Sequence, residues 1–198
     1  MAGKKLVLFD FDGTITTADT MFLFTRFVVG TPRFLFGLAV ISIPLILHKF
    51  KIVGAQRAKE ILLTHFFRGM STAKFDKYGK DFAEKIIPHY IRPTALPVIA
   101  NRESRIIVVS ASAENWISHW CTSNNLEFIA TKLEVIDGKI TGKISGKNCN
   151  SDEKVNRIKE KVNLSDYTDI IAYGDTSGDL PMLALATEKH FKPFRDKK

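Results

Sequence analysis

Three short apolar runs, each ending in serine or aspartate residues, constrain the fold more than any other feature of the sequence. They occupy residues 5–11, 105–111 and 170–175. Continuous apolar runs of this length are typical of the central strands of a parallel sheet that is covered on both faces. Helical patterns lie between the runs, at residues 94–103, 113–124 and 152–162, and after the last one, at residues 178–186. This alternation predicts an α/β fold with a doubly wound, Rossmann-like parallel sheet as its core.

Residues 16–93 contain no strand signal and interrupt this alternation. Apolar and aromatic residues recur there at helical spacing in two series, Ala58, Ile61, Leu62, His65, Phe66 and then Phe75, Tyr78, Phe82, Ile86. We therefore expect an all-helical cap domain at 16–93, inserted after the first strand, and a core domain formed by 1–15 and 94–198. Residues 133–144 predict an antiparallel hairpin attached to the core, because Asp137-Gly138 suits a tight turn.

The length and the cysteine content limit the class of protein. A chain of 198 residues is too short for two ordinary domains in tandem. Cys121 and Cys149 are far apart and form no CxxC pair, which is typical of a reducing compartment. The first apolar stretch is too short for the core of a signal peptide. We expect a cytoplasmic protein.

Positive charge is concentrated in the predicted cap. The chain has a formal net charge of +8, and residues 21–93 carry twelve Lys and Arg against four Asp and Glu. This pattern predicts either an anionic partner for the segment or a solvated basic surface. Residues 34–47 are uncharged. They are interpreted as a helix buried in the cap, a membrane span, or a shallow contact with an anionic membrane, which would make the protein peripheral at the inner membrane surface.

The sequence DFDGT follows directly on the first predicted strand. Asp10 and Asp12 are two residues apart, so a bend at Gly13 would bring both carboxylates to the carboxyl end of the strand. Two ionised carboxylates this close repel each other, and a divalent metal or a shared proton must stabilise the pair. Both alternatives indicate chemistry rather than a purely structural role.

The sequence GDTSGD follows on another predicted strand and adds two further carboxylates, Asp175 and Asp179. Carboxyl ends of parallel strands meet at one edge of a sheet, so these residues are expected close to Asp10. An oxygen-rich cluster of this kind suits Mg²⁺, whereas zinc prefers sulfur and nitrogen ligands. The sequence therefore predicts a magnesium site.

Two weaker signals come from the middle of the chain. Ser110 ends a predicted strand, where its hydroxyl and the following amides, beginning with Ala111, could bind phosphate oxygens. Lys154 begins a charged helix. A serine at a strand end is usually a helix cap and a lysine in such a helix is usually solvated, so neither residue indicates a function by itself.

The order of these four motifs resembles the haloacid dehalogenase-like phosphatase superfamily. The helical insertion after the first motif is similar to that of its subfamily I, which includes the phosphoserine phosphatases. The resemblance implies an enzyme that hydrolyses phosphate monoesters, with Asp10 as nucleophile forming an aspartyl phosphate and Asp12 as general acid and base. It also implies that Ser110, Ala111 and Lys154 bind the phosphoryl group.

The resemblance implies the metal ligands as well. Asp10, the carbonyl oxygen of Asp12 and Asp175 would hold Mg²⁺, with Asp179 either as a further ligand or as the support of one. A phosphotransferase that passes the phosphoryl group to an alcohol would use the same residues, and the sequence does not separate it from a hydrolase.

The substrate class remains open between two relatives. Phosphoserine phosphatases bind an amino acid with an acidic residue and a cation of the cap. In this chain Asp19 is the candidate for the acidic residue, and Arg57 or Lys59 is the candidate for the cation. The bacterial C-type phosphatidylglycerophosphate phosphatases resemble this chain in their long apolar run followed by basic residues, which would suit a lipid phosphate. A non-catalytic anion-binding module and an RNA-binding module are the alternatives from other classes. No RNA-binding motif is present in the sequence and we expect no nucleic-acid partner; the oligomeric state is not predicted.

Overall fold

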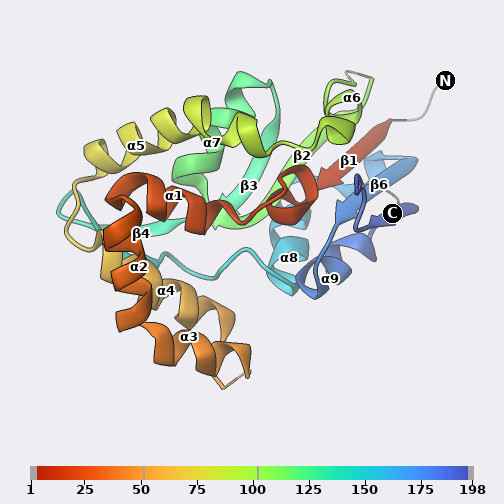
Figure 1. The fold of residues 1–198 in the computed structure, drawn as a ribbon. Helices are drawn as coiled ribbons and strands as arrows, with labels where there is room; N and C mark the ends of the chain where they lie inside the picture. The colour runs from red at the N-terminus through yellow and green to blue at the C-terminus, as the bar shows by residue number, and fades with distance from the viewer. Residues whose placement is uncertain (1–3, 51, 102, 196–198) are drawn as a thin grey trace.

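The computed structural model describes residues 4–50, 52–101 and 103–195, which form an α/β core and a helical cap (Figure 1). The core sheet has five parallel strands in the order β3-β2-β1-β6-β7. The strands are β1 (Lys5–Phe9), β2 (Arg105–Ala113), β3 (Glu127–Thr131), β6 (Asp169–Gly174) and β7 (Glu188–Phe191). The predicted parallel α/β fold is therefore confirmed, with the first strand in the middle of the sheet.

Both faces of the sheet are covered, as the continuous apolar runs require. In β1, Leu6 and Leu8 face helices α8 (Asp152–Lys161) and α9 (Leu180–Leu183), while Val7 and Phe9 face α7 (Glu114–Ser123) and the cap. Side chains alternate between the two faces of a strand, so each face receives every second residue. The core is doubly wound because its helices pack on opposite sides of the sheet.

The predicted elements of the core differ from the structure in three ways. The helix expected at 178–186 consists of a 3-10 turn (Ser177–Asp179) followed by the one-turn helix α9. The helix expected at 94–103 is reduced to a 3-10 turn (Pro93–Ala95) and the one-turn helix α6 (Leu96–Ile99), in a segment that begins with two closely spaced prolines. Strands β3 and β7 were not predicted. They are the two edge strands, and edge strands with mixed polar composition lack the continuous apolar signal of central strands.

Five helices between β1 and β2 form the cap: α1 (Thr20–Val29), α2 (Thr31–Val40), α3 (Ser42–Lys49), α4 (Ala55–Phe67) and α5 (Thr72–Lys85). A 3-10 turn (Ile87–Tyr90) leads back to the core. Phe24 of α1 lies at the centre of the cap, where its ring stacks 4.8 Å from Trp116 of α7 and contacts Phe82 at 5.3 Å. The aromatic core of the cap is thus continuous with the core domain.

The chain enters and leaves the cap at one point. Thr16 pairs with Ile91 as an antiparallel bridge. Thr17 N donates to the carbonyl of Tyr90 at 2.8 Å, and Arg92 N donates to that of Ile15 at 2.8 Å. These contacts support residues 16 and 93 as the limits of the cap domain, which we propose on this basis.

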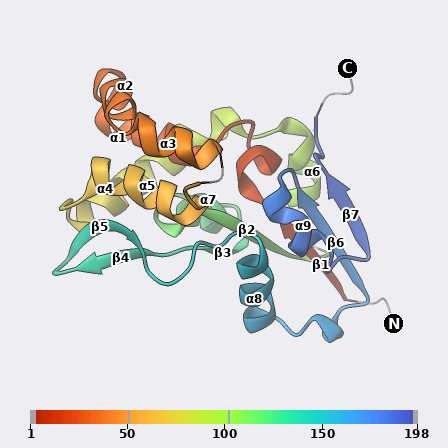
Figure 2. The same cartoon turned by 90° about the horizontal axis from the view of Figure 1, so that it is seen from below.

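The predicted hairpin consists of β4 (Leu133–Ile136) and β5 (Lys139–Ile144), paired antiparallel. Asp137 and Gly138 occupy the turn with φ of +49° and +69°, the backbone that this dipeptide favours. The hairpin also joins the cap, because Ile140 N donates to the carbonyl of Met70 at 2.8 Å. It therefore lies under α4, on the side of the cap opposite to α2 and α3 (Figure 2).

The uncharged run at 34–47 forms parts of α2 and α3, which are interrupted at Ile41. Phe34, Gly37 and Ile41 are buried, but the opposite face of both helices is exposed. The expectation of a helix fully buried in the cap is therefore wrong for that face. Within the described ranges, no unbroken helix has the length and apolar character of a membrane span. Helices α1 and α2 reach that length and apolar character only when taken together, across a bend of 118°.

Candidate active site

A small cavity opens at the carboxyl ends of β1, β2 and β6, between the core and the cap. Its volume is about 130 Å³. Strand β1 lies between β2, which is followed by α7, and β6, which is followed by α9, and these two helices cover opposite faces of the sheet. The carboxyl edge at such a point is the usual position of a ligand in folds of this kind. The cavity is lined by Asp10, Asp12, Asp19, Met21, Lys59, Ala111, Ser112, Asn150, Lys154, Thr176 and Asp179.

The loop after β1 brings Asp10 and Asp12 to the cavity as predicted. Asp10 lies just beyond the end of β1, and its N–H donates to the carbonyl of Tyr173 in β6 at 2.9 Å. This bond continues the pairing of the two strands and fixes the backbone of Asp10. Gly13 then turns the chain with φ of +81°, and a Cβ atom there would overlap the carboxylate of Asp175. Glycine is needed at this position both for the backbone conformation and for the close approach of the two loops.

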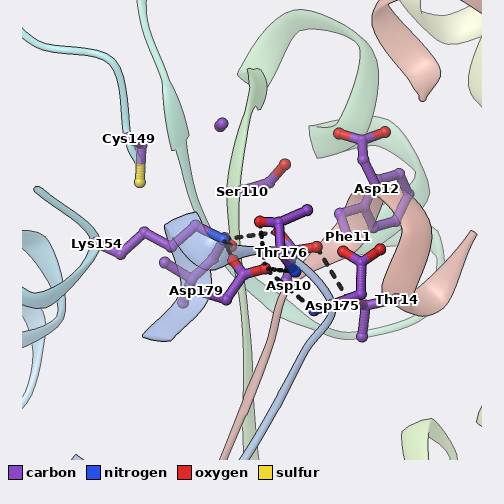
Figure 3. Close-up of polar contacts among 12 residues, drawn as sticks. Asp10, Phe11, Asp12, Thr14, Ser110, Cys149, Lys154, Asp175, Thr176 and Asp179 are labelled. Carbon is purple, nitrogen blue, oxygen red and sulfur yellow. Dashed lines mark hydrogen bonds and ion pairs between the residues drawn. The ribbon is translucent and has the colours of Figure 1, made fainter. Parts of the chain in front are cut away.

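Asp10 is almost completely buried and receives two donors. Lys154 Nζ donates to its Oδ1 at 2.6 Å, and Thr14 Oγ1 donates to its Oδ2 at 3.1 Å. Burial raises the pKa of Asp10 to about 7, against the opposing effect of Lys154. In Figure 3, Lys154 and Asp12 lie on different sides of Asp10. Thr14 was not among the predicted site residues, although it belongs to the DFDGT motif.

Lys154 extends from α8 into the site and is 1% exposed. Its ammonium group donates to Asp10 Oδ1, to Asp179 Oδ1 at 2.7 Å and to the carbonyl of Val109 at 2.8 Å. Burial alone would lower the pKa of Lys154, but the two carboxylates outweigh it and raise that pKa above its ordinary value. The buried cation thus links α8 to the loops after β1 and β6.

Asp179 is held from both sides. Its Oδ1 accepts from Lys154, and its Oδ2 accepts from Asp175 N at 3.1 Å, Thr176 N at 2.9 Å and Thr176 Oγ1 at 2.9 Å. Burial opposes ionisation, yet Lys154 and Thr176 outweigh it and hold the pKa of Asp179 below its usual value. The spacing of Thr176 and Asp179 is that of a capping box, which is the sequence signal for this part of the site.

Three carboxylates form a group that can hold a metal ion. One ligand oxygen each from Asp10, Asp175 and Asp179 can be chosen so that all lie within 4.8 Å of one another. Asp175 Oδ2 accepts from Arg195 at 3.0 Å, whereas Asp175 Oδ1 is buried without a hydrogen-bond partner among the described residues. Burial and Asp179 raise the pKa of Asp175. A buried oxygen without a donor, beside two other carboxylates, fits a cation, and an all-oxygen donor set suits Mg²⁺.

Asp12 is oriented by the cap and by β2. Its Oδ1 accepts from Thr20 N, the first residue of α1, at 2.7 Å, and its Oδ2 accepts from Ser112 Oγ at 2.6 Å. The two hydroxyls of Thr20 and Ser112 are 3.1 Å apart, and Trp116 Nε1 donates to Thr20 Oγ1 at 3.1 Å. Sequence reasoning missed these three residues, because a polar chain between distant segments has no local pattern.

The predicted phosphate-binding residues lie at the end of β2. Ser110 is buried, and its hydroxyl accepts from Ser112 N at 3.0 Å. The carbonyl of Ala111 accepts from Lys59 Nζ at 2.6 Å. Ala111 and Ser112 line the cavity, whereas Ser110 is not part of its wall. A phosphate contact by Ser110 stays a prediction, as does the metal ligation by the Asp12 carbonyl.

The three predicted specificity residues of the cap lie in different places. Asp19 and Lys59 line the cavity, and Arg57 is exposed beside Glu60 outside it. Partial desolvation of its carboxyl group at the cavity, together with Asp12, raises the pKa of Asp19, although the residue as a whole is exposed. Burial also lowers the pKa of Lys59, whose ammonium donates to Asn148 Oδ1 at 2.9 Å. The structure thus brings one acidic residue and one cation of the cap to the same cavity.

The fold and the site together define a capped α/β enzyme with a carboxylate-rich centre at the carboxyl edge of its parallel sheet. The family model of the haloacid dehalogenase-like hydrolases matches residues 7–184. Protein CicA of Caulobacter vibrioides (strain NA1000 / CB15N) is 34% identical over 197 residues, which cover 97% of this chain and 87% of that protein. The chain belongs to the haloacid dehalogenase-like hydrolase family.

Solved structures share the fold. The crystal structure of a protein with unknown function from Bordetella pertussis Tohama I has a TM-score of 0.81 at 21% identity, covering 94% of this chain and 88% of that one. A substrate-bound phosphoserine phosphatase has a TM-score of 0.65 at 22% identity, covering 95% and 85%. These likenesses confirm the α/β core and the inserted helical cap.

Proposed function

We propose that the chain is a Mg²⁺-dependent phosphatase that hydrolyses phosphate monoesters through an aspartyl phosphate on Asp10. One observation carries this proposal: the carboxylates of Asp10 and Asp12 line the same small cavity, with the ammonium of Lys154 bonded to Asp10. A nucleophile, an acid–base group and a cation in one partly closed space are the groups that phosphoryl transfer requires.

In the first step, a carboxylate oxygen of Asp10 attacks phosphorus, and the bond from phosphorus to the ester oxygen breaks. Asp12 gives its proton to the departing ester oxygen, so the alcohol leaves neutral. Ser112 and Thr20 hold the Asp12 carboxyl group at 2.6 and 2.7 Å, which fixes the position from which the proton is delivered. Lys154 offsets negative charge that develops beside Asp10.

In the second step, water attacks the phosphorus of the aspartyl phosphate. Asp12, now ionised, takes a proton from this water, and the bond from phosphorus to the Asp10 oxygen breaks. The Asp10 carboxylate and the protonated Asp12 are thereby regenerated and inorganic phosphate is released. Asp19, Met21 and Lys59 form the cap side of the cavity and so limit the access of other water to it.

Asp10, Asp175 and Asp179 would hold the magnesium ion. When bound, Mg²⁺ supplies positive charge that keeps Asp10 ionised and reduces its repulsion of the phosphate. The resemblance to phosphatases adds the carbonyl of Asp12 as a further ligand.

As the substrate we propose a lipid phosphate such as phosphatidylglycerophosphate. A cavity of about 130 Å³ admits a phosphate and a few adjoining atoms, so the remainder of a larger substrate would stay outside it. The basic cap beside exposed apolar side chains supports an amphiphilic molecule. The second candidate is phosphoserine, which is favoured by one observation: Asp19 and Lys59 line the same cavity. An acidic group and a cation placed in this way could bind the amino and carboxylate groups of an amino acid.

The test is Mg²⁺-dependent release of phosphate from phosphatidylglycerophosphate in detergent and from L-phosphoserine. We expect turnover of the lipid, loss of turnover on Asp10→Asn, and acid-stable radiolabel on wild-type protein quenched during turnover of a labelled substrate. Full activity of Asp10→Asn would contradict the covalent mechanism. Turnover of phosphoserine alone would replace the lipid with an amino-acid substrate.

A further inference from the structure

The outer side of the cap exposes a series of large apolar side chains. Phe36 is 73% exposed and Ile43 is 70% exposed. We call the series the outer apolar face: Leu35, Phe36, Val40, Ile43, Ile46, Phe50 and Ile52. It includes seven of the twelve large apolar residues that are exposed in the described part of the chain. Apolar side chains gathered in this way mark an interaction surface, whereas single ones do not.

The opposite side of the same helices is fixed against the rest of the cap. Phe34 packs 6.1 Å from the ring of Phe66 in α4, and a Cβ atom on Gly37 would overlap that ring. Ile41, between α2 and α3, is buried. The helices therefore cannot turn their outer side inward. A helix that is apolar on all sides is normally covered on all sides, and here one side has no cover within the described chain.

The charge around the outer apolar face is of one sign. Residues 20–59 contain no Asp or Glu and six Lys and Arg. Arg33, near the start of α2, precedes the apolar series and Lys49, at the end of α3, lies within it, and both are exposed. Arg26 is also exposed nearby in the sequence. The segment thus combines apolar side chains with cations, and α2 and α3 contribute no acidic side chain to the surface.

This combination selects one kind of partner. A second copy docked through the same face would bring the cations of both copies together, because a two-fold contact pairs each patch with itself. A bilayer with anionic lipids offers an apolar interior beneath a negatively charged surface, and so meets both properties at once. In Figure 2, α1, α2 and α3 form the layer of the cap farthest from the hairpin β4–β5.

We propose that the outer apolar face is a docking surface for an anionic lipid bilayer. Its apolar side chains enter the boundary between headgroups and acyl chains, with α2 and α3 lying along the surface, while Arg33 and Lys49 contact the anionic headgroups. The surface uses no residue of the cavity, so the inference is independent of the proposed chemistry at Asp10, although the proposed lipid substrate rests on the same exposed side chains.

The experiment is flotation of the full-length protein with vesicles of phosphatidylcholine, with and without phosphatidylglycerol. We expect binding to the anionic vesicles and weaker binding to the neutral ones. The double variant Phe36→Gln/Ile43→Gln should lower the partition coefficient by about tenfold or more, because two side chains lose their transfer into the apolar region. Arg33→Gln/Lys49→Gln should lower it on anionic vesicles and leave neutral ones unchanged.

Ile136→Gln is the matched control, since Ile136 is 57% exposed but lies on the hairpin. It should bind vesicles like the wild type, and all variants should hydrolyse a soluble phosphate monoester like the wild type. Binding that is absent in the wild type, or unaffected by Phe36→Gln/Ile43→Gln, overturns the proposal. A wild-type dimer that these substitutions dissociate, without vesicle binding, would assign the face to a second copy instead. Vesicle binding by a protein without phosphatase activity would refute the catalytic proposal alone.

Discussion

Replacing Lys154 with methionine tests whether the buried cation holds the active-site loops together. The substitution keeps an unbranched side chain but leaves Asp10, Asp179 and the carbonyl of Val109 without a donor that each now has at 2.6 to 2.8 Å. Removing one member of a buried ion pair costs about 3–5 kcal/mol, because the remaining charge stays buried without compensation. For a chain of this length, 1 kcal/mol corresponds to about 2–4 °C in Tm. We therefore expect the free energy of unfolding to fall by about 3–5 kcal/mol, which corresponds to a fall in Tm of about 6–20 °C.

The assay is urea unfolding of the metal-free protein at pH 7, followed by the fluorescence of Trp116 and Trp120 in the aromatic core beside the site. Lys159→Met is the matched control, because Lys159 is exposed on the same helix and its loss should change the free energy of unfolding by less than about 0.5 kcal/mol. A loss below about 1 kcal/mol for Lys154→Met, or one equal to that of the control, would show that the carboxylates need no cation and refute this reasoning.

Three further predictions follow from contacts described above. Ser112→Ala should lower kcat about tenfold or more with a smaller change in KM, since Asp12 loses a charged hydrogen bond of 2.6 Å, and Ser112→Thr should restore much of the rate. A raised KM with an unchanged kcat would indicate a binding role instead. Mg²⁺ at a hundred times its Kd should stabilise the wild type by about 2.7 kcal/mol, as measured by scanning calorimetry. This gain should be lost in Asp175→Asn and retained in the control Asp169→Asn, whose carboxylate lies at the start of β6. Glu127→Gln should cost about 0.2–1 kcal/mol at pH 7, because Arg105, which donates to Glu127 at 2.6 Å, lowers the pKa of this half-exposed carboxyl group. That contribution is present in full above the ordinary pKa of 4.5 and disappears as the pH falls through the lower folded-state value, so wild type and variant should unfold alike in acid, and a difference that persists there would contradict the assignment.

The central part of the fold could be predicted from the sequence because its signals are local. β1, β2 and β6 are covered on both faces, so each forms a continuous apolar run, and the polar residues that end these runs meet at one edge of the sheet. The positions of Asp10, Asp12, Asp175 and Asp179 follow from this rule alone. The edge strands β3 and β7 have no such run and were missed.

The burial of a polar residue, and its contacts with distant segments, could not be predicted in the same way. Lys154 belongs to a charged helix, yet the packing of α8 beneath the site buries it completely. Arg195 reaches Asp175 from near the end of the chain, and Ser112 reaches Asp12 across 100 positions. Such contacts depend on how distant segments pack, and no local pattern of residues records them. The outer side of α2 and α3 is the converse case, where an apolar run looked like buried sequence but is half exposed.

The pairing of the two ends of the cap with each other has a consequence for how such a protein changes through evolution. Because Thr16 and Ile91 pair with each other, the two ends of a segment of more than seventy residues are neighbours in space. A replacement segment that starts and finishes at that pair leaves the register of β1 with β2 and β6 as it was, provided that it still covers Trp116 and still offers Asp12 a donor as Thr20 N does. The segment that carries Asp19, Lys59 and the outer apolar face can therefore diverge, while Asp10, Asp12, Asp175 and Asp179 keep their places at the edge of the sheet.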